Sequence, residues 1–284
     1  MELEKHTYEY DVALDSNNAP ARVIRMAGHG RRILEVGAGP GSITRHLIGT
    51  NNCDVVALEI DPSAIAKLKE FCQKIYSLDL NDATWPQSLS HEDKFDVVIA
   101  ADVLEHVYDP LRTLKEMKSL LREGGEIILS LPHVGHCAIN ACLLDEDFTY
   151  RDWGLLDKTH IRFFGIKNIN RLYADAGMGI VEAQFVILTP GQTEFADRWD
   201  RLPAKTQRAL LANPFGCVYQ VVTKAKALDH AERNIDLMTI PPAFGPKEMV
   251  VGSLRETARK YLSPEMKMQL LAMGRKFGVF DKRS

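Results

Sequence analysis

Short apolar runs alternate with helical patterns over most of this chain, and this alternation is the feature that most constrains its fold. The run Phe95–Ala101 (FDVVIAA) is continuously apolar, as a strand buried on both faces should be. Strands separated by helices pair in parallel, because the chain must cross the sheet between them. The sequence therefore predicts an α/β protein with a doubly wound, mostly parallel sheet. The expected strands cover residues 32–36, 54–60, 75–80, 95–101, 126–131, 180–188 and 217–223.

Helical patterns and one irregular segment fill the spaces between these strands. Asp61 precedes Pro62, which places a capping residue before a proline at the first helical position. The stretch 133–162 has no clean period, and long irregular segments after a central strand often fold over a ligand. A polar and helical insertion is expected between the last two strands. Helices are expected over 42–48, after Asp61, over 111–121 with closure by glycines at 124–125, and over 166–176 with Gly177 as the stop.

Changes in composition along the chain predict three parts. An N-terminal helical or lid segment is expected over 1–30, the main domain over 31–226, and a helical C-terminal extension over 227–284. Prolines and glycines at 241–246 mark a linker before helices expected within 247–277. Tyr8 and Tyr10 are candidates to cover a positively charged ligand through their ring faces, although packing against the fold is the more common role of such residues.

Composition excludes several classes of protein. The 284 residues carry 35 Lys and Arg against 38 Asp and Glu, a net charge of −3, which leaves no electrostatic footprint for a duplex nucleic acid partner. No apolar run approaches the roughly 18 residues of a spanning helix, so we expect no integral membrane protein. The 5 cysteines are scattered, which predicts reduced thiols rather than a disulfide framework. The charged start lacks the apolar region of a secretion signal, so we expect a cytoplasmic protein.

The sharpest motif is ILEVGAGPG, at Ile33–Gly41. The strand brings Glu35 to its carboxyl end, and the glycines that follow let the backbone approach a ligand closely. A dinucleotide site needs G-x-G-x-x-G, whose third glycine would fall on Ser42. A carboxylate before the first glycine would also repel a pyrophosphate. Glu35 therefore favours a positively charged ligand, such as the sulfonium and ammonium groups of S-adenosylmethionine.

On these residues the chain resembles the class I S-adenosylmethionine-dependent methyltransferases. The resemblance implies a sheet of seven strands in the order 3-2-1-4-5-7-6, with the last strand antiparallel. It implies that Glu59, at the end of the second strand, grips the ribose of the cofactor, because a carboxylate accepts both hydroxyl protons. The cofactor-binding positions implied by the resemblance are Glu35, Gly37, Ala38, Gly39, Glu59, Ile60, Asp79, Leu80, Ala101 and Asp102.

The methyl acceptor should lie against the segments that follow the fourth and fifth strands. The run D-V-L-E-H at 102–106, with the segment 154–164, resembles the branch of the family that methylates small molecules and glycans. Transfer to a hydroxyl needs its proton removed, and a histidine with a pKa near its usual value of about 6.5 suits that task. His160 is the first candidate base, with Asp157 to orient its ring, and His106 is the second. Alternatively, these side chains only pin the loop and bond the backbone.

A divalent cation is a second mechanism that the same residues allow. Ubiquinone-type and small-RNA 2′-O-methyltransferases resemble this chain in using a Glu-His pair in this way. A metal would lower the pKa of the acceptor hydroxyl directly. Ordinary capping and dipole chemistry at a helix start explains the same residues without a metal. The candidate ligands are Asp102, Glu105 and His106, joined by His133, His136 or His160.

The sequence thus predicts an S-adenosylmethionine-dependent methyltransferase that methylates a hydroxyl of a small molecule or of a sugar or glycan. One alternative is methylation of a nitrogen or of a lipid-linked acceptor. Another is a catalytically silent partner subunit, against which the intact Glu35 and Glu59 argue, and a nicotinamide oxidoreductase is the remote third. The expected C-terminal helices could join two copies of the chain, because 255–276 interleaves six basic and two acidic residues with apolar ones.

Overall fold

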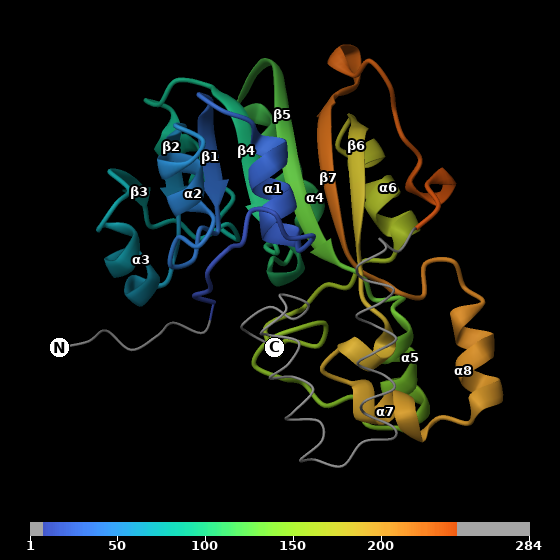
Figure 1. Cartoon of the computed structure of the whole chain (residues 1–284). Coiled ribbons are helices and arrows are strands. Elements are labelled where there is room, and N and C mark those ends of the chain that lie inside the picture. The colour runs from blue at the N-terminus through green and yellow to red at the C-terminus, as the bar shows by residue number, and fades with distance from the viewer. Residues whose placement is uncertain (1–7, 243–284) are drawn as a thin grey trace. The chain divides into compact units, whose positions relative to one another are not determined.

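The computed structural model describes residues 8–242, and over this range it contains one seven-stranded sheet (Figure 1). The strand order β3-β2-β1-β4-β5-β7-β6 confirms the predicted topology. Neighbouring strands from β3 to β5 pair in parallel, whereas β7 runs antiparallel to β5. The strands are β1 (Arg32–Val36), β2 (Asp54–Leu58), β3 (Lys74–Tyr76), β4 (Phe95–Ala101), β5 (Leu121–Pro132), β6 (Met178–Ile187) and β7 (Val218–Ala227).

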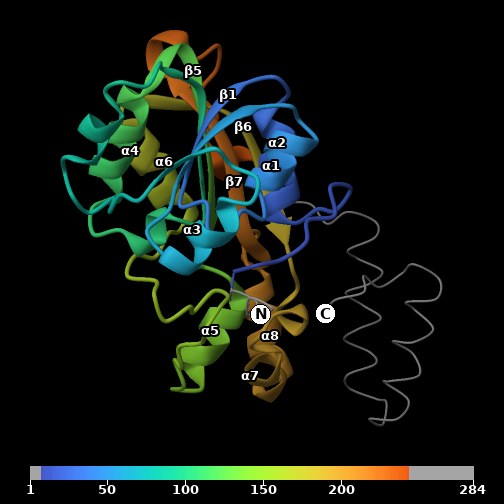
Figure 2. The ribbon, with the colours of Figure 1, turned by 90° about the vertical axis from the view of Figure 1, so that its left-hand side faces the viewer.

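Helices cover both faces of this sheet, as a doubly wound fold requires. Figure 2 shows α4 and α6 on one side of the strands, with α1 and α2 on the other. The Asn18 side chain caps α1 and the Asp61 side chain caps α3, in each case by accepting a hydrogen bond from a backbone N–H of the first turn. The helices of this unit are α1 (Ala19–Ala27), α2 (Thr44–Gly49), α3 (Pro62–Leu68), α4 (Pro110–Ser119) and α6 (Ile166–Asp175).

The N-terminal helix α1 is part of the hydrophobic core. Val23 and Ile24 are buried in one cluster with Ile33 of β1 and Val97 of β4. The described residues separate into two compact units, the first made of residues 8–134, 151–186 and 220–240. The three-part division at residues 30 and 226 stays a prediction, and the helices expected within 247–277 lie outside the described residues.

Among the described residues, the second unit consists of residues 135–150, 187–219 and 241–242. Among its described residues, Trp199 packs with Cys137 and Ala141 in a small apolar cluster. The helical insertion expected before the last strand is present as α7 and α8. The helices of this unit are α5 (Cys137–Leu144), α7 (Ala196–Arg201) and α8 (Ala204–Leu211).

Several observed elements differ from their predicted bounds. The prediction that all of 133–162 is irregular is wrong, because Cys137–Leu144 forms α5. Seven of the eight residues of that helix (CAINACLL) are apolar, so it shows no amphipathic period. β3 ends at Tyr76, and β5 begins at Leu121, ahead of the glycines that were expected to close a helix. A shift in the pairing of β4 with β5 between Phe95 and Val97 accommodates the extra residues.

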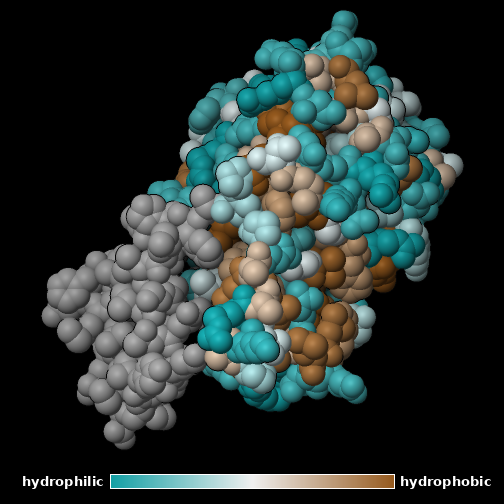
Figure 3. Space-filling view, turned by 90° about the vertical axis from the view of Figure 1, so that its right-hand side faces the viewer, coloured by the Kyte–Doolittle hydropathy of each residue, from teal (hydrophilic) through white to brown (hydrophobic). Residues whose placement is uncertain are grey.

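Hydrophobic surface is distributed without one dominant patch on the face seen in Figure 3. There, the hydrophobic residues form small groups separated by hydrophilic ones, as on ordinary protein surfaces. Among residues 8–242, no helix combines the length and the hydrophobicity that crossing a bilayer requires.

Replacing Gly37 tests how tightly the glycine loop is packed, because an added Cβ would contact Val103 there. Gly37 has a left-handed φ of 66°, and an added Cβ would lie 2.6 Å from Cγ2 of Val103. We expect Gly37→Ala to lower the free energy of unfolding by about 3 kcal/mol, through backbone strain and overpacking. Gly30→Ala is the matched control, because Gly30 has a φ of 63° but open space around a Cβ, and should cost about 1 kcal/mol. Urea unfolding measures both variants, and equal losses would contradict this account.

Candidate functional site

Glu35 and the glycine loop lie at the carboxyl end of β1. The Glu35 side chain is buried, and the Thr44 hydroxyl donates a hydrogen bond of 2.6 Å to its Oε2. Gly37 and Gly39 both have left-handed φ angles, so the loop turns back on itself without side chains in the way. The N–H of Ala38 donates to the carbonyl of Leu58 at 2.9 Å, which ties the loop to the end of β2.

The electrostatics of Glu35 favour a cationic partner. Burial raises the pKa of its carboxyl to about 8, the Thr44 hydroxyl acts in the opposite direction, and the nearby charge of Glu59 raises the pKa further. A carboxyl with such a pKa is largely neutral at pH 7. A positive charge brought close to it would restore the ionised form.

Glu59 binds the glycine loop directly. Its Oε2 accepts a hydrogen bond of 2.6 Å from the N–H of Gly39, and its Oε1 accepts bonds of 2.8 Å from the N–H groups of Ile60 and Asp61. This carboxylate therefore joins the ends of β1 and β2. The predicted contact with a ribose stays a prediction.

Two other predicted cofactor positions follow β3 in a loop. Asp79 is exposed, and its Oδ1 accepts bonds from the N–H and the side-chain amide of Asn81. The carbonyl of Leu80 accepts a bond of 3.1 Å from Arg112 at the start of α4. The loop is therefore held in place by α4 rather than by the sheet.

Asp102, directly after β4, is held in an unusual conformation. Its φ of 55° is left-handed, which is uncommon outside glycine and typical of functional sites. Its Oδ1 accepts a bond of 2.8 Å from the Ser130 hydroxyl, and its Oδ2 accepts one of 2.7 Å from the amide of Gln220. Burial raises the pKa of this carboxyl, while both hydrogen bonds act to lower it.

Three other acid and histidine side chains meet beside this position. Glu105 and His106 lie on the short 3₁₀ turn Leu104–His106 after β4, and His160 comes from the loop before α6. One possible ligand atom from each of the three lies within 4.8 Å of the others. Nε2 of His160 is 3.9 Å from Oε1 of Glu105, and the two imidazole rings meet edge to face at 4.8 Å.

Glu105 is the anomalous member of this cluster. Its side chain is 0% exposed, yet neither carboxylate oxygen has a hydrogen-bond partner. Burial raises the pKa of Glu105 well above its usual value, and the charges of Asp102 and Asp157 act in the same direction. Leaving a buried polar group unpaired costs about 1–3 kcal/mol. Such a group in a native protein points to a partner that the chain itself does not supply.

A backbone carbonyl contacts Nδ1 of each of the two histidines. Nδ1 of His106 is 3.2 Å from the carbonyl oxygen of Thr159, and Nδ1 of His160 is 3.4 Å from that of Leu155. A carbonyl oxygen only accepts, so each Nδ1 carries the hydrogen and each neutral ring keeps a lone pair on Nε2. Burial lowers the pKa of His160 to about 4, and His106 acts in the same direction, so His160 is neutral at pH 7.

The remaining candidates have other partners. The Asp157 carboxylate accepts bonds from Thr159 and Tyr8, whereas the Leu155 carbonyl orients the His160 ring. His136 belongs to the second unit, where it caps α5 and its Nε2 contacts the Leu188 carbonyl at 2.9 Å. His133 forms an isolated β-bridge with Phe164. None of these three belongs to the Glu105 cluster found among the described residues.

The N-terminal segment runs past the glycine loop before α1 begins (Figure 1). The N–H of Tyr10 donates a bond of 3.1 Å to the Ser42 hydroxyl, and Glu9 forms an ion pair with Lys67 of α3. Tyr10 is 41% exposed, but burial and the charges of Asp102 and Glu35 raise the pKa of its hydroxyl. A covering role for Tyr8 and Tyr10 stays a prediction.

Comparison with known proteins identifies the family. A family model described as a methyltransferase domain matches residues 10–183. The chain belongs to this family. It is a class I S-adenosylmethionine-dependent methyltransferase, and its sheet order is that of the predicted fold.

Relatives and solved structures lie at low sequence identity. A ubiquinone biosynthesis O-methyltransferase of Aeromonas salmonicida is 24% identical over 169 residues, which cover 58% of this chain and 70% of that protein. One of Bradyrhizobium diazoefficiens is 25% identical over 194 residues, covering 68% and 74%. A solved S-adenosylmethionine-dependent methyltransferase of Archaeoglobus fulgidus superposes with a TM-score of 0.51 at 16% identity, over 73% of this chain and 92% of that one. This structural likeness shows the shared fold.

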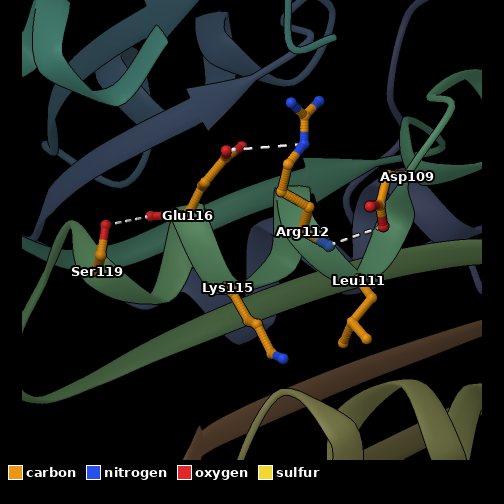
Figure 4. A pocket seen from close by; sticks show the side chains of 6 residues that line it. All are labelled: Asp109, Leu111, Arg112, Lys115, Glu116 and Ser119. Carbon is orange, nitrogen blue, oxygen red and sulfur yellow. Dashed lines mark hydrogen bonds and ion pairs between the residues drawn. The ribbon is translucent and has the colours of Figure 1, made fainter. Parts of the chain in front are cut away.

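A hollow on α4 of the methyltransferase has a different character from the strand ends (Figure 4). Two of its charged side chains are paired, with Arg112 Nε 3.7 Å from Glu116 Oε1, and Asp109 accepts a hydrogen bond from the backbone N–H of Arg112. We therefore assign it no part in methyl transfer. It is lined by Asp109, Leu111, Arg112, Lys115, Glu116 and Ser119.

The raised pKa of Glu35 predicts a pH dependence of cofactor binding. With a pKa of about 8, the free carboxyl carries a proton at pH 6.5, and binding of a cation should release that proton. The affinity for S-adenosylmethionine should therefore rise from pH 6.5 to 8.5, by at most about tenfold per pH unit. Calorimetry in two buffers of different ionisation heat measures both the affinity and the proton release.

Glu35→Gln supplies the control for this effect, because an amide cannot titrate. S-adenosylhomocysteine, which lacks the sulfonium charge, should show a weaker pH dependence than S-adenosylmethionine. Equal affinity of the unaltered protein for S-adenosylmethionine at both pH values would remove Glu35 from the cofactor site.

Proposed function

We propose that this methyltransferase transfers a methyl group to a hydroxyl of a small molecule, at a divalent cation bound by Glu105, His106 and His160. The observation that carries the proposal is the buried carboxyl of Glu105, whose oxygens accept no hydrogen bond, beside the imidazoles of His106 and His160, each of which has a backbone carbonyl against its Nδ1. The relatives named as O-methyltransferases of ubiquinone biosynthesis support a hydroxyl as the acceptor, and a sugar or glycan hydroxyl stays within the proposal.

The residues at the strand ends suit the cofactor. S-adenosylmethionine supplies, when bound, an electrophilic methyl group on a positively charged sulfur. Glu35 matches a positive charge, and the loop at Gly37–Gly39 presents backbone that a ligand can approach closely. Glu59 is placed to accept ribose hydroxyls in exchange for the amide bonds that it now holds. The other residues proposed to line the cofactor are Ala38, Ile60, Asp79, Leu80, Ala101 and Asp102.

The donor set of the cluster suits a divalent transition metal. Two imidazole nitrogens with one carboxylate oxygen favour ions such as Mn²⁺, Fe²⁺ or Zn²⁺ over Mg²⁺, which prefers oxygen ligands. A bound cation of this kind lowers the pKa of a coordinated hydroxyl. The hydrogen on Nδ1 of each histidine already faces a carbonyl, which is the second-shell arrangement of metal-binding imidazoles.

His160 fits the role of a ligand better than that of a general base. With a pKa of about 4, its ring accepts a proton poorly at pH 7. The same burial that weakens it as a base keeps its Nε2 lone pair available to a metal. Asp102 is not included in the proposed ligand set, because both of its oxygens accept other hydrogen bonds.

Cation binding itself provides the first test. Calorimetric titration with Mn²⁺ should show one site in the unaltered protein. Glu105→Gln keeps the shape of the side chain but removes the charge, and should weaken Mn²⁺ binding by more than about 100-fold, beyond what the loss of an outer-shell contact causes. Glu70→Gln, at an exposed position, is the matched control and should bind as the unaltered protein does. Undiminished binding by Glu105→Gln would refute this ligand set.

Methyl transfer provides the second test. Labelled methyl from S-adenosylmethionine should enter a small-molecule or glycan fraction of a cell extract, and a chelator should abolish the labelling until Mn²⁺ is restored. His160→Ala should lower this transfer more than it lowers cofactor binding. Labelling that withstands the chelator would contradict the cation. A labelled product identified as an N-methyl amine or a methyl ester, rather than a methyl ether, would contradict transfer to a hydroxyl.

A further inference from the structure

Thr159 makes two contacts with the same nitrogen of His106. Nδ1 of His106 lies 3.2 Å from the carbonyl oxygen of Thr159 and 3.0 Å from its hydroxyl oxygen. Because the carbonyl can only accept, the hydrogen on Nδ1 points toward Thr159 and is shared between its two oxygens. Thr159 was not singled out by any motif in the sequence.

The direction of the Thr159 hydroxyl is set by Asp157. The hydroxyl donates to Oδ1 of Asp157 at 2.6 Å, and the N–H of Thr159 donates to the same oxygen at 2.8 Å. With its hydrogen committed to Asp157, the hydroxyl oxygen has only lone pairs to offer His106.

Tyr8 completes this arrangement from the other end of the sequence. Its hydroxyl donates to Oδ2 of Asp157 at 3.1 Å, across 149 residues of chain. Burial acts to raise the pKa of Asp157, but the bonds from Thr159 and Tyr8 outweigh it and lower the pKa, so the carboxyl stays ionised and accepting. Burial also raises the pKa of Tyr8, so the phenol stays a donor.

We propose that Thr159 is a positioning residue of the site: its hydroxyl, oriented by Asp157 and Tyr8, selects the Nδ1–H form of His106 and keeps Nε2 of that ring unprotonated. The role of this tautomer in metal binding rests on the proposed function, because an imidazole binds a metal only through an unprotonated nitrogen. The selection itself needs no cation. It therefore can be observed in the metal-free protein.

A second Asp-x-Thr pair shows what the motif does without a histidine. The N–H and the hydroxyl of Thr84 both donate to Oδ1 of Asp82, each at 2.8 Å, just as Thr159 does to Asp157. That pair pins an exposed turn. The difference at Thr159 is the imidazole, so Thr84→Val is a matched control for Thr159→Val.

The test records long-range ¹H–¹⁵N spectra of the metal-free protein labelled with ¹⁵N-histidine, in which the two tautomers of a neutral ring differ. We expect His106 to be mostly the Nδ1–H form. Thr159→Val should shift the tautomer ratio toward Nε2–H by about 2- to 10-fold, the ratio that one net hydrogen bond sets. Thr159→Ser should keep the original ratio, and so should Thr84→Val. Thermal unfolding of each variant shows whether it is folded.

Mn²⁺ titration gives the consequence for the site. Thr159→Val should bind Mn²⁺ about 10-fold more weakly than Thr159→Ser, as expected for the loss of an outer-shell partner. Tyr8→Phe should act in the same direction but less, because Asp157 keeps both of its bonds from Thr159.

Two results would overturn the proposal: an Nε2–H form of His106 in the unaltered protein, or an unchanged tautomer ratio in folded Thr159→Val. The two proposals fail separately. A tautomer ratio that responds to Thr159 in a protein that binds no Mn²⁺ would support the positioning role and refute the cation.

Discussion

Parallel pairing of β1 with β2 and with β4 is the constraint on which the site depends. The register sets Val36 beside Leu58 and beside Ala100, so three strands end at the same edge of the sheet. Glu35 lies near the end of β1, and the loops that leave this edge carry Glu59 and the turn with Glu105. The backbone N–H of Gly39 then bonds to Glu59, which fixes one strand end to the next.

Two of the carboxyl groups at this edge, those of Glu35 and Glu105, are buried and favour their neutral forms. Burial raises the pKa of Glu35 and of Glu105, and it lowers that of His160. An ionised group in such a place is stable only with an opposite charge close by. Glu35 and Glu105 therefore each need a positive charge close by in order to ionise. We assign this charge to the cofactor at Glu35 and to a metal ion at Glu105.

The sequence was enough to predict the strands of the sheet, but not to predict which side chains contact one another around Glu105. The bounds of β1 and β4 were predicted correctly, because buried parallel strands are continuously apolar and end at glycine or polar residues. α5 was missed because a helix with seven apolar residues out of eight has no amphipathic period. The bonds of Asp102 with Ser130 and Gln220 join residues 28 and 118 positions apart, and no local pattern encodes them. Glu105, His106 and His160 were all candidates, but only tertiary structure separates them from Asp102, His133 and His136.

An anomalous difference map from a crystal soaked in Mn²⁺ tests the central claim most directly, because it locates the ion without reference to any acceptor. The account predicts one strong peak within coordination distance of a Glu105 oxygen and of Nε2 of both His106 and His160. A fully occupied peak elsewhere, or no peak with the Glu105 carboxyl still unpartnered, would contradict it.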